Sequence, residues 1–111
     1  MIEKLVLDYL NSELKVSAYM EEPEHPGKSY VLLEKTGSGC TNHIRRATIS
    51  IQSYAESLYK AASLNETVKA VMEQIVELPD ICRCALNSDY NFTDPETHRY
   101  RYQAVFDITH Y

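Results

Sequence analysis

Polar and apolar residues alternate along the last part of the chain. One side of the alternation holds Tyr100, Tyr102, Ala104, Phe106 and Ile108, and the other side is polar apart from Val105. A repeat of two residues is typical of a strand with one buried face. We therefore expect a long strand over residues 99–111, with Tyr100 and Tyr102 packed into the core beside Phe106.

Shorter patterns occupy the first third of the chain. Apolar residues recur at helical spacing over residues 2–12, which predicts a short amphipathic helix. Residues 16–20 and 30–33 are apolar runs that predict strands. Residues 21–28, between the two runs, contain prolines and a glycine and therefore predict a loop.

A glycine-containing segment and a second alternation follow in the middle of the chain. Gly37-Ser38-Gly39 is typical of a turn, because glycine adopts backbone conformations that other residues disfavour. Residues 43–53 then alternate, with Ala47, Ile49 and Ile51 on the apolar side. This second alternation predicts a strand that faces the core.

The longest helical pattern comes next. Its apolar residues step by three or four positions through Leu58, Ala61, Leu64, Val68, Val71, Met72 and Ile75. Two capping-box patterns, Ser53…Glu56 and Ser63…Glu66, leave a start near Tyr54 or near Leu64 open. Pro79 ends the pattern, because proline cannot continue the hydrogen bonds of a helix.

The remaining segments complete the expected fold. Residues 81–86 predict a strand, and the polar residues 87–97 predict a loop before the final strand. The order is therefore helix, three strands, helix and two strands, mostly with short connections that favour an antiparallel or mixed sheet. We expect one domain, residues 1–111, with an α+β fold: a two-layer sandwich of about five strands, mostly antiparallel, with both helices on one face.

The charge balance narrows the class of partner. Lys and Arg number 11 against 16 Asp and Glu, which gives a formal net charge of −5. Non-specific binding to nucleic acid or to an anionic membrane needs a basic surface, so we expect neither. The segment after Met1 has no apolar signal-peptide core, and three cysteines do not make a disulfide framework. We therefore expect a reducing cytoplasm and free thiols.

Cysteine and histidine residues form one candidate metal site. Cys40 and His43 stand three positions apart, and Cys82 and Cys84 stand two apart on a predicted strand, where both sulfurs would project from one face. Residues of these types are ligands of tetrahedral zinc. The spacing differs from that of zinc knuckles, and the alternative is that Cys82 and Cys84 are small buried residues. We expect no cofactor, and zinc binding stays open.

A nucleophilic site at Cys40 is the second candidate. The residue follows Gly37-Ser38-Gly39, whose backbone amides could stabilise an oxyanion, and His43 could act as a base. No third residue can be placed that would orient the histidine, and the glycines suit a turn equally well. We therefore expect no enzymatic activity.

Several arginines fall on predicted strands. They are Arg45, Arg46, Arg83, Arg99 and Arg101. Such residues either line an electropositive sheet face or pair with acidic residues on neighbouring strands. The sequence favours pairing with acids.

Three segments carry a resemblance to a known family. The first is a short helix that leads to a proline-rich loop and an apolar strand, with Glu22-Pro23 followed by Tyr30-Val31-Leu32-Leu33-Glu34. The second is an alternating strand that runs into a long helix, from Ala47 to Ala55. The third is the closing strand, from Arg99 to Ile108. In these segments and in the order of its elements, the chain resembles the tail-terminator or tail-completion proteins of long-tailed bacteriophages and prophages.

The resemblance implies a structural protein without catalytic residues. Proteins of that family form a ring, usually of six subunits, that caps the tail tube and joins it to the head. The implied partners are further copies of the chain, the major tail tube protein and the head connector protein. The implied location is the virion tail, after assembly in the bacterial cytoplasm.

Sheet edges and the polar loops 21–28 and 87–97 are the segments expected to make the contacts of such a ring. Their mixed charges suit a polar interface. The alternative class is a small ferredoxin-like module that binds a ligand or regulates a partner, because such a module shares this layout of sheet and helices.

Overall fold

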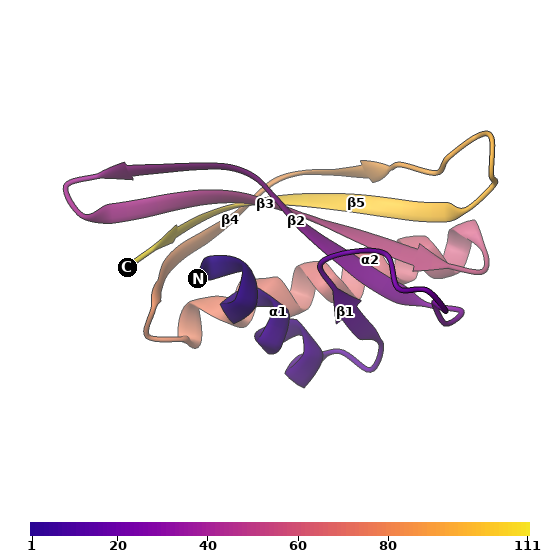
Figure 1. Ribbon diagram of the computed structural model, residues 1–111, viewed down its shortest axis with the longest axis horizontal. Helices are drawn as coiled ribbons and strands as arrows, with labels where there is room; N and C mark the ends of the chain where they lie inside the picture. The colour runs from indigo at the N-terminus through magenta and orange to yellow at the C-terminus, as the bar shows by residue number, and fades with distance from the viewer.

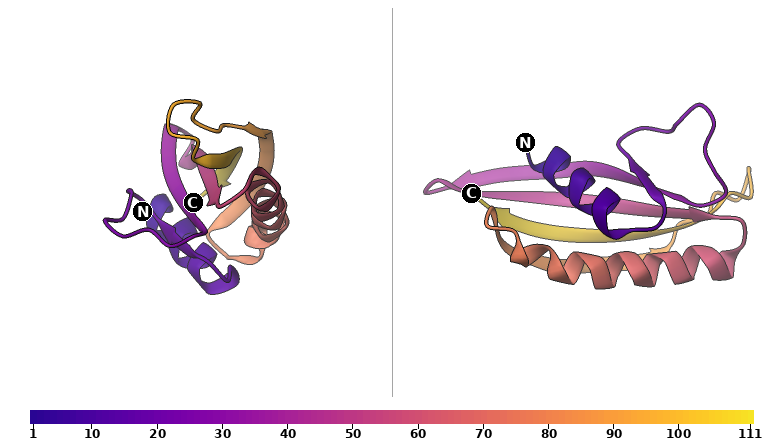
Figure 2. Two further views of the ribbon diagram at one scale, coloured as in Figure 1. Left: turned by 90° about the vertical axis from the view of Figure 1, so that its right-hand side faces the viewer. Right: turned by 90° about the horizontal axis from the view of Figure 1, so that it is seen from below.

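Both helices lie on one face of a five-stranded sheet and leave the other face uncovered (Figure 1, Figure 2). The computed structural model describes residues 1–111. In chain order the elements are α1 (Ile2–Glu13), β1 (Ser17–Tyr19), β2 (Tyr30–Thr41), β3 (Ile44–Ala55), α2 (Leu58–Glu73), the 3-10 helix η1 (Gln74–Glu77), β4 (Ile81–Asn91) and β5 (Tyr100–His110). The predicted α+β class and the predicted order of elements are confirmed.

The order of strands across the sheet is β1-β2-β3-β5-β4. β1 runs parallel to β2 and pairs only with Tyr30–Leu32, whereas all other neighbouring strands are antiparallel. β4 therefore forms one edge of the sheet. β2 forms the opposite edge from Leu33 onward, where β1 no longer covers it.

The hydrophobic core lies between the sheet and the two helices. Its fully buried members include Val6, Leu10, Val31, Ile49, Ile51, Val68, Met72, Ile75 and Ala104. The two predicted alternations are confirmed in β3 and in the second half of β5, where Phe106 and Ile108 face the helices. Because burial of one large aliphatic side chain contributes about 1.5–3 kcal/mol, this single layer of contacts holds both helices on the sheet.

β2 and β3 form a long hairpin that gives the molecule its elongated shape of 44 × 25 × 25 Å (Figure 1). Its turn consists of Asn42 and His43, with φ values of 51° and 66°. Positive φ at both central residues gives a tight turn whose twist matches that of the paired strands. The predicted turn at Gly37-Ser38-Gly39 is therefore wrong, because these residues lie within β2 and none of the glycines has a positive φ.

The ends of other elements also differ from the prediction. α2 begins after Ser57, whose hydroxyl accepts a hydrogen bond of 3.1 Å from the backbone N–H of Lys60, so neither predicted capping box starts the helix. β4 continues to Asn91, through the first part of the segment expected as a loop. Tyr100 is 37% exposed rather than in the core, because its row, shared with Ala55, is the last row of the sheet.

Candidate functional site

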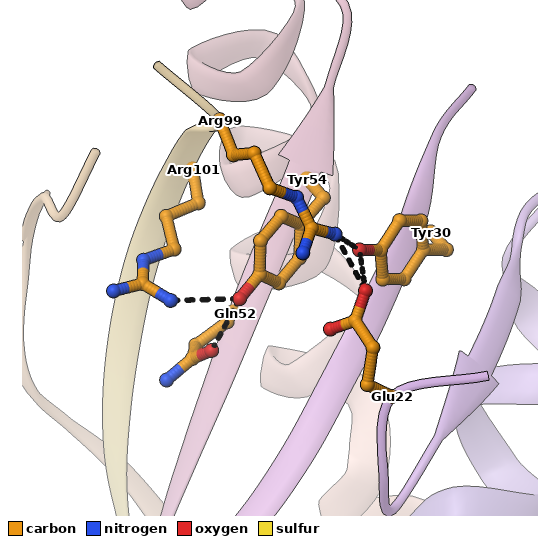
Figure 3. A network of polar contacts seen from close by, with 6 residues as sticks. All are labelled: Glu22, Tyr30, Gln52, Tyr54, Arg99 and Arg101. Atoms are coloured by element: carbon orange, nitrogen blue, oxygen red, sulfur yellow. Dashed lines mark hydrogen bonds and ion pairs between the residues drawn. The ribbon is translucent and has the colours of Figure 1, made fainter. Parts of the chain in front are cut away.

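The helix-free face of the sheet carries a cluster of aromatic and arginine side chains (Figure 3). Tyr30, Tyr54 and Arg101 are partners in one row across β2, β3 and β5. In a strand, residues two apart share a face. Val31, Ile51 and Phe106 point to the helices. Tyr30, Tyr54 and Arg101 each lie an odd number of positions from the inward residue of their own strand, so they point to the opposite face.

The two tyrosine rings are the centre of the cluster. Tyr30 and Tyr54 stack with their ring centroids 4.7 Å apart and 5° between their planes. The guanidinium carbon of Arg99 lies 4.9 Å from the centroid of Tyr54, and that of Arg101 lies 5.7 Å from it. A cation within about 6 Å of an aromatic face is attracted by the electron density of the ring. The tyrosines therefore hold both arginines on the sheet.

Arg99 ties the start of β5 to the loop that precedes β2. One of its terminal nitrogens donates to Oε1 of Glu22 at 2.5 Å and also to the hydroxyl of Tyr30. The same carboxylate oxygen accepts a hydrogen bond of 2.6 Å from Tyr30. Arg99 precedes β5 and Glu22 lies in the segment 20–29, so this ion pair joins two loops at one end of the molecule (Figure 3).

Arg101 is held by uncharged acceptors. Its Nε donates to the backbone carbonyl of Phe92 at 2.6 Å, and a terminal nitrogen donates to the hydroxyl of Tyr54 at 2.8 Å. The guanidinium carbon also lies 4.4 Å from the ring centroid of Phe92. No carboxylate forms an ion pair with Arg101. The pKa of Asp94 is lowered mainly by a hydrogen bond from the backbone of Glu96, with a small contribution from the charge of Arg101.

A chain of side-chain hydrogen bonds continues from this cluster toward β4. Tyr54 donates to Gln52 at 3.1 Å, Gln52 donates to Gln103 at 2.9 Å, and Gln103 donates to Tyr90 at 2.5 Å. The chain crosses β3, β5 and β4. It fixes the rotamers of these residues, so the helix-free face is an ordered polar surface.

The arginines predicted on strands differ in their partners. Arg99 forms an ion pair, whereas Arg45, Arg46, Arg83 and Arg101 form none. The expectation that they pair with acids is therefore correct only for Arg99, which precedes its strand. Tyr30 and Tyr54 were not predicted as parts of a site, and Glu22 was predicted only as part of the contact loop 21–28. The signal that could have found the tyrosines is the alternation that places Tyr54 on the face opposite Ile51.

The two edges of the sheet are the other prominent feature. None of the backbone hydrogen bonds outside the strand ladders involves residues 33–41 of β2 or residues 82–91 of β4. Along both segments the backbone groups that point away from the neighbouring strand have no backbone partner. Unpaired strand edges are templates on which another chain can add.

The structure separates the four candidate metal ligands. Cys40 and His43 lie at the tip of the hairpin, whereas Cys82 and Cys84 lie on β4. A bulge between Ile81 and Arg83 interrupts the alternation at Cys82, so the two β4 cysteines do not follow the pattern that the prediction assumed. No group of three or more His, Cys, Asp or Glu side chains is arranged to hold a metal ion.

The burial of the cysteines also corrects the prediction. Cys82 is exposed rather than buried, and Cys84 is half-buried against the core. Burial raises the pKa of the Cys84 thiol to about 11, with a smaller contribution from Asp107. Cys40 is exposed, next to the turn, and the predicted oxyanion turn beside it does not exist because Gly37-Ser38-Gly39 is strand.

No protein-family model matches the chain, and no curated protein matches it significantly. None of the helices combines the length and the apolar content needed to cross a membrane.

Proposed function

We propose that the protein is a structural subunit of a phage or prophage tail, a tail terminator that assembles as a ring at the head-proximal end of the tail tube. The resemblance of three segments to that family suggests this class. The ring is expected to contain six subunits, as in that family. Its partners are further copies of the chain, the major tail tube protein and the head connector protein, and its location is the virion tail.

The observation that carries the proposal is the pair of unpaired edges on opposite sides of one sheet. A ring forms when one patch of each subunit meets a different patch of the next and the rotation closes. β4 and the distal part of β2 are two such different patches. Each copy can therefore contact one neighbour through β4 and the other neighbour through the distal part of β2.

The two ends of the molecule suit different contacts. The hairpin tip projects at one end, and the loops 20–29 and 92–99 meet at the other (Figure 1). The ion pair between Glu22 and Arg99 orders the loop end before any partner binds. We assign contacts with the tail tube and the head connector to these two ends, because the edges between them are used for copies of the chain.

The test uses tail tubes of the same phage that were assembled without this protein. The purified protein is added to these tubes, and its binding is measured. We expect electron microscopy to show added density at one end of the tube, and we expect tails made without the protein to differ in length and to fail to join heads. Absence of binding, together with tails that stop at normal length and join heads without the protein, would overturn the proposal. A monomer in dilute solution agrees with it, since assembly requires the tail end as a template.

The second candidate, a ferredoxin-like ligand-binding module, has one observation in its favour. A groove of about 540 Å³ lies between α1 and the turn before β4, lined by Leu5, Tyr9 and Leu78 among others. This volume falls in the range of small-molecule sites. Two results together would favour this candidate over the first. A small molecule would raise the unfolding temperature of the native chain but not of Tyr9→Ala, and the native chain would not bind tails.

A further inference from the structure

The free edge of β2 contains two glycines, and the single chain explains only one of them, because Gly37 follows a bulge between Lys35 and Gly37 and glycine often marks a bulge. Neither Gly37 nor Gly39 has a positive φ. A Cβ added at Gly39 would meet nothing within 4 Å, and one added at Gly37 would reach only Thr48 at 3.9 Å. Glycine weakens a strand and often marks a place where another backbone approaches closely. Gly39, which lies beside no bulge, therefore points to a neighbour that the isolated chain lacks.

The direction of the strands fits a second copy as that neighbour. β2 is antiparallel to β3, β3 to β5, and β5 to β4. It follows that β4 runs opposite to β2. If a second copy is placed beside the first with its sheet facing the same way, its β2 meets β4 in the antiparallel direction, and the alternation of strand directions continues from one copy to the next.

The rows of the sheet define where the two strands would meet. Cys40, Arg45, His110 and Ile81 form one row from the edge of β2 to the edge of β4. Leu33 and Asp89 similarly end a row near the other limit of the free segment. Without a shift in register, residues 33–40 of one copy therefore lie along Asp89 to Ile81 of the next. Tyr90 and Asn91, the last residues of that β4, fall on the rows of Leu32 and Val31 that β1 already occupies, so they leave the shared ladder.

We propose that residues 33–40 of one copy add to β4 of the next as an antiparallel strand, so that the ring is held by a sheet that continues through every subunit. This inference rests on the proposed function, because it names the contact by which the ring forms. The partner is a second copy of this chain. Gly37 and Gly39 leave room on the helix-free face for exposed side chains of the adjacent β4, such as Arg83, which ends the row of Gly39.

The native cysteines offer a direct test of this contact. Cys40 would lie opposite Ile81 of the neighbouring copy and thus one position from Cys82. Directly opposed residues on neighbouring strands have Cα atoms about 4.5–5.5 Å apart, and a disulfide spans Cα distances up to about 6.8 Å. A Cys84→Ser protein keeps only Cys40 and Cys82. Each copy then has one thiol on each edge, so oxidation with copper phenanthroline on tail ends should give a ladder of species up to the closed ring.

Two control variants set the outcomes of this test. Cys40→Ser/Cys84→Ser and Cys82→Ser/Cys84→Ser proteins have one thiol each and can give no species larger than a dimer. The strands of two copies can also pair in a register that brings another residue of β2 next to Cys82. To detect such a register, Cys40→Ser is combined with Ser38→Cys or Thr36→Cys in the Cys84→Ser protein, which moves the thiol along β2. A protein that binds tail ends but gives no species above the dimer with any of the three positions would overturn the strand contact and leave the proposed function standing. A protein that does not bind tail ends and gives no ladder would overturn both.

A backbone variant tests the same contact without cross-linking. Thr41 and Ile44 close the two-residue turn as a hydrogen-bonded pair, and hydrogen-bonded and non-bonded pairs alternate along a hairpin. The N–H of Ser38 therefore points to the free edge, and Ser38→Pro removes it without removing a bond to β3. We expect Ser38→Pro to keep the unfolding midpoint within a few degrees of that of the Ser38→Ala control and to lose at least tenfold in tail-end binding. A folded Ser38→Pro protein that binds tail ends as well as Ser38→Ala would contradict the proposal.

Discussion

Tyr30 and Tyr54 stack almost in parallel across neighbouring strands, 4.7 Å between ring centroids, on the face of the sheet that no helix covers. Tyr54 is 6% exposed there, because Arg99 and Arg101 cover it. A stacked pair of this kind contributes about 0.5–1.5 kcal/mol beyond the burial of its surface. The pair is therefore a small second centre of packing on a face that is otherwise mostly polar.

Two substitutions at Tyr54 should separate stacking from hydrogen bonding. Tyr54→Phe keeps the stacked rings and removes the hydroxyl that binds Arg101 and Gln52, so we expect the free energy of unfolding to fall by about 1 kcal/mol. Tyr54→Leu also removes the aromatic ring and should cost roughly 1 kcal/mol more. Chemical denaturation measures both. Equal losses for the two variants would mean that the stacking contributes nothing.

The ion pair between Glu22 and Arg99 should contribute little to stability. Its side chains are 39% and 44% exposed, and exposed pairs are worth about 0.2–1 kcal/mol. We expect a coupling energy in this range from a double-mutant cycle of Glu22→Gln and Arg99→Gln, and a smaller value in high salt because salt screens exposed charges. A coupling that does not change with salt would show that the pair is more desolvated than the structure indicates.

Phe106 and Val105 test the register of β5. Phe106 is 3% exposed on the helix side, and its replacement by alanine should lower the free energy of unfolding by ~3–5 kcal/mol. Val105 is half-buried on the opposite face, so Val105→Ala should cost less than half as much. Urea denaturation of both variants gives the comparison, and similar losses would indicate a shift of β5 by one residue, which exchanges the two faces.

The start of α2 can be tested at two serines. Ser57→Ala removes the hydroxyl that accepts the bond from the backbone N–H of Lys60 and should cost about 1 kcal/mol. Ser63→Ala, in the second capping-box pattern of the sequence, lies inside the helix and should change the free energy of unfolding by less than about 0.5 kcal/mol. Thermal unfolding of the two variants is the measurement. A larger loss at Ser63 would place the helix start where the capping box predicts it.

The three thiols should differ in reactivity. At pH 8 we expect iodoacetamide to label the exposed Cys40 and Cys82 quickly and Cys84 slowly, because a pKa of about 11 leaves very little thiolate at Cys84. Labelling of Cys84 should become faster as the pH rises toward 11. Mass spectrometry of peptides from the native protein gives the rates, and rapid labelling of Cys84 at pH 8 would contradict its burial.

The same thiol should affect stability at alkaline pH. The pKa of Cys84 is raised in the folded protein from 9.0 to about 11, so the folded state holds its proton more tightly than the unfolded state. The contribution of the protonated Cys84 thiol to the free energy of unfolding is complete below pH 9, and it is lost as the pH rises from 9 toward 11. Denaturant midpoints across this range should fall more for the native chain than for Cys84→Ala, which lacks the titrating group.

The sequence was sufficient for the elements whose apolar pattern repeats. α1, α2, the second half of β5 and the inward residues of β3 were predicted, because one face of each is buried in the core and the hydrophobic pattern records that burial. The tip of the hairpin and the end of β4 were not predicted. Residues 34–46 are all exposed, and a strand with two exposed faces has no alternation by which the sequence could show it.

The candidate site was less predictable because it depends on register between strands. Tyr30 and Tyr54 stand far apart in the chain and meet only because β2 and β3 pair in one particular register. The bulge at Cys82 is likewise set by the pairing of β4 with β5. The alternation along β3 places Tyr54 on the outer face, but no periodicity within a single segment records that it meets Tyr30 or that β4 bulges at Cys82. The metal-site hypothesis therefore assumed a regular strand, and the aromatic cluster was missed.

The short strand β1 has a consequence for how long the exposed edge of β2 is. β1 pairs with Tyr30–Leu32 and then ends, so any strand that adds to this edge from outside meets β1 as a fixed stop. The stop prevents the incoming strand from sliding past Leu33 toward the loop end, so it excludes some of the registers that the backbone alone would allow. A longer β1 would pair with the whole edge of β2. The length of β1 therefore decides whether another strand can add to this side of the sheet.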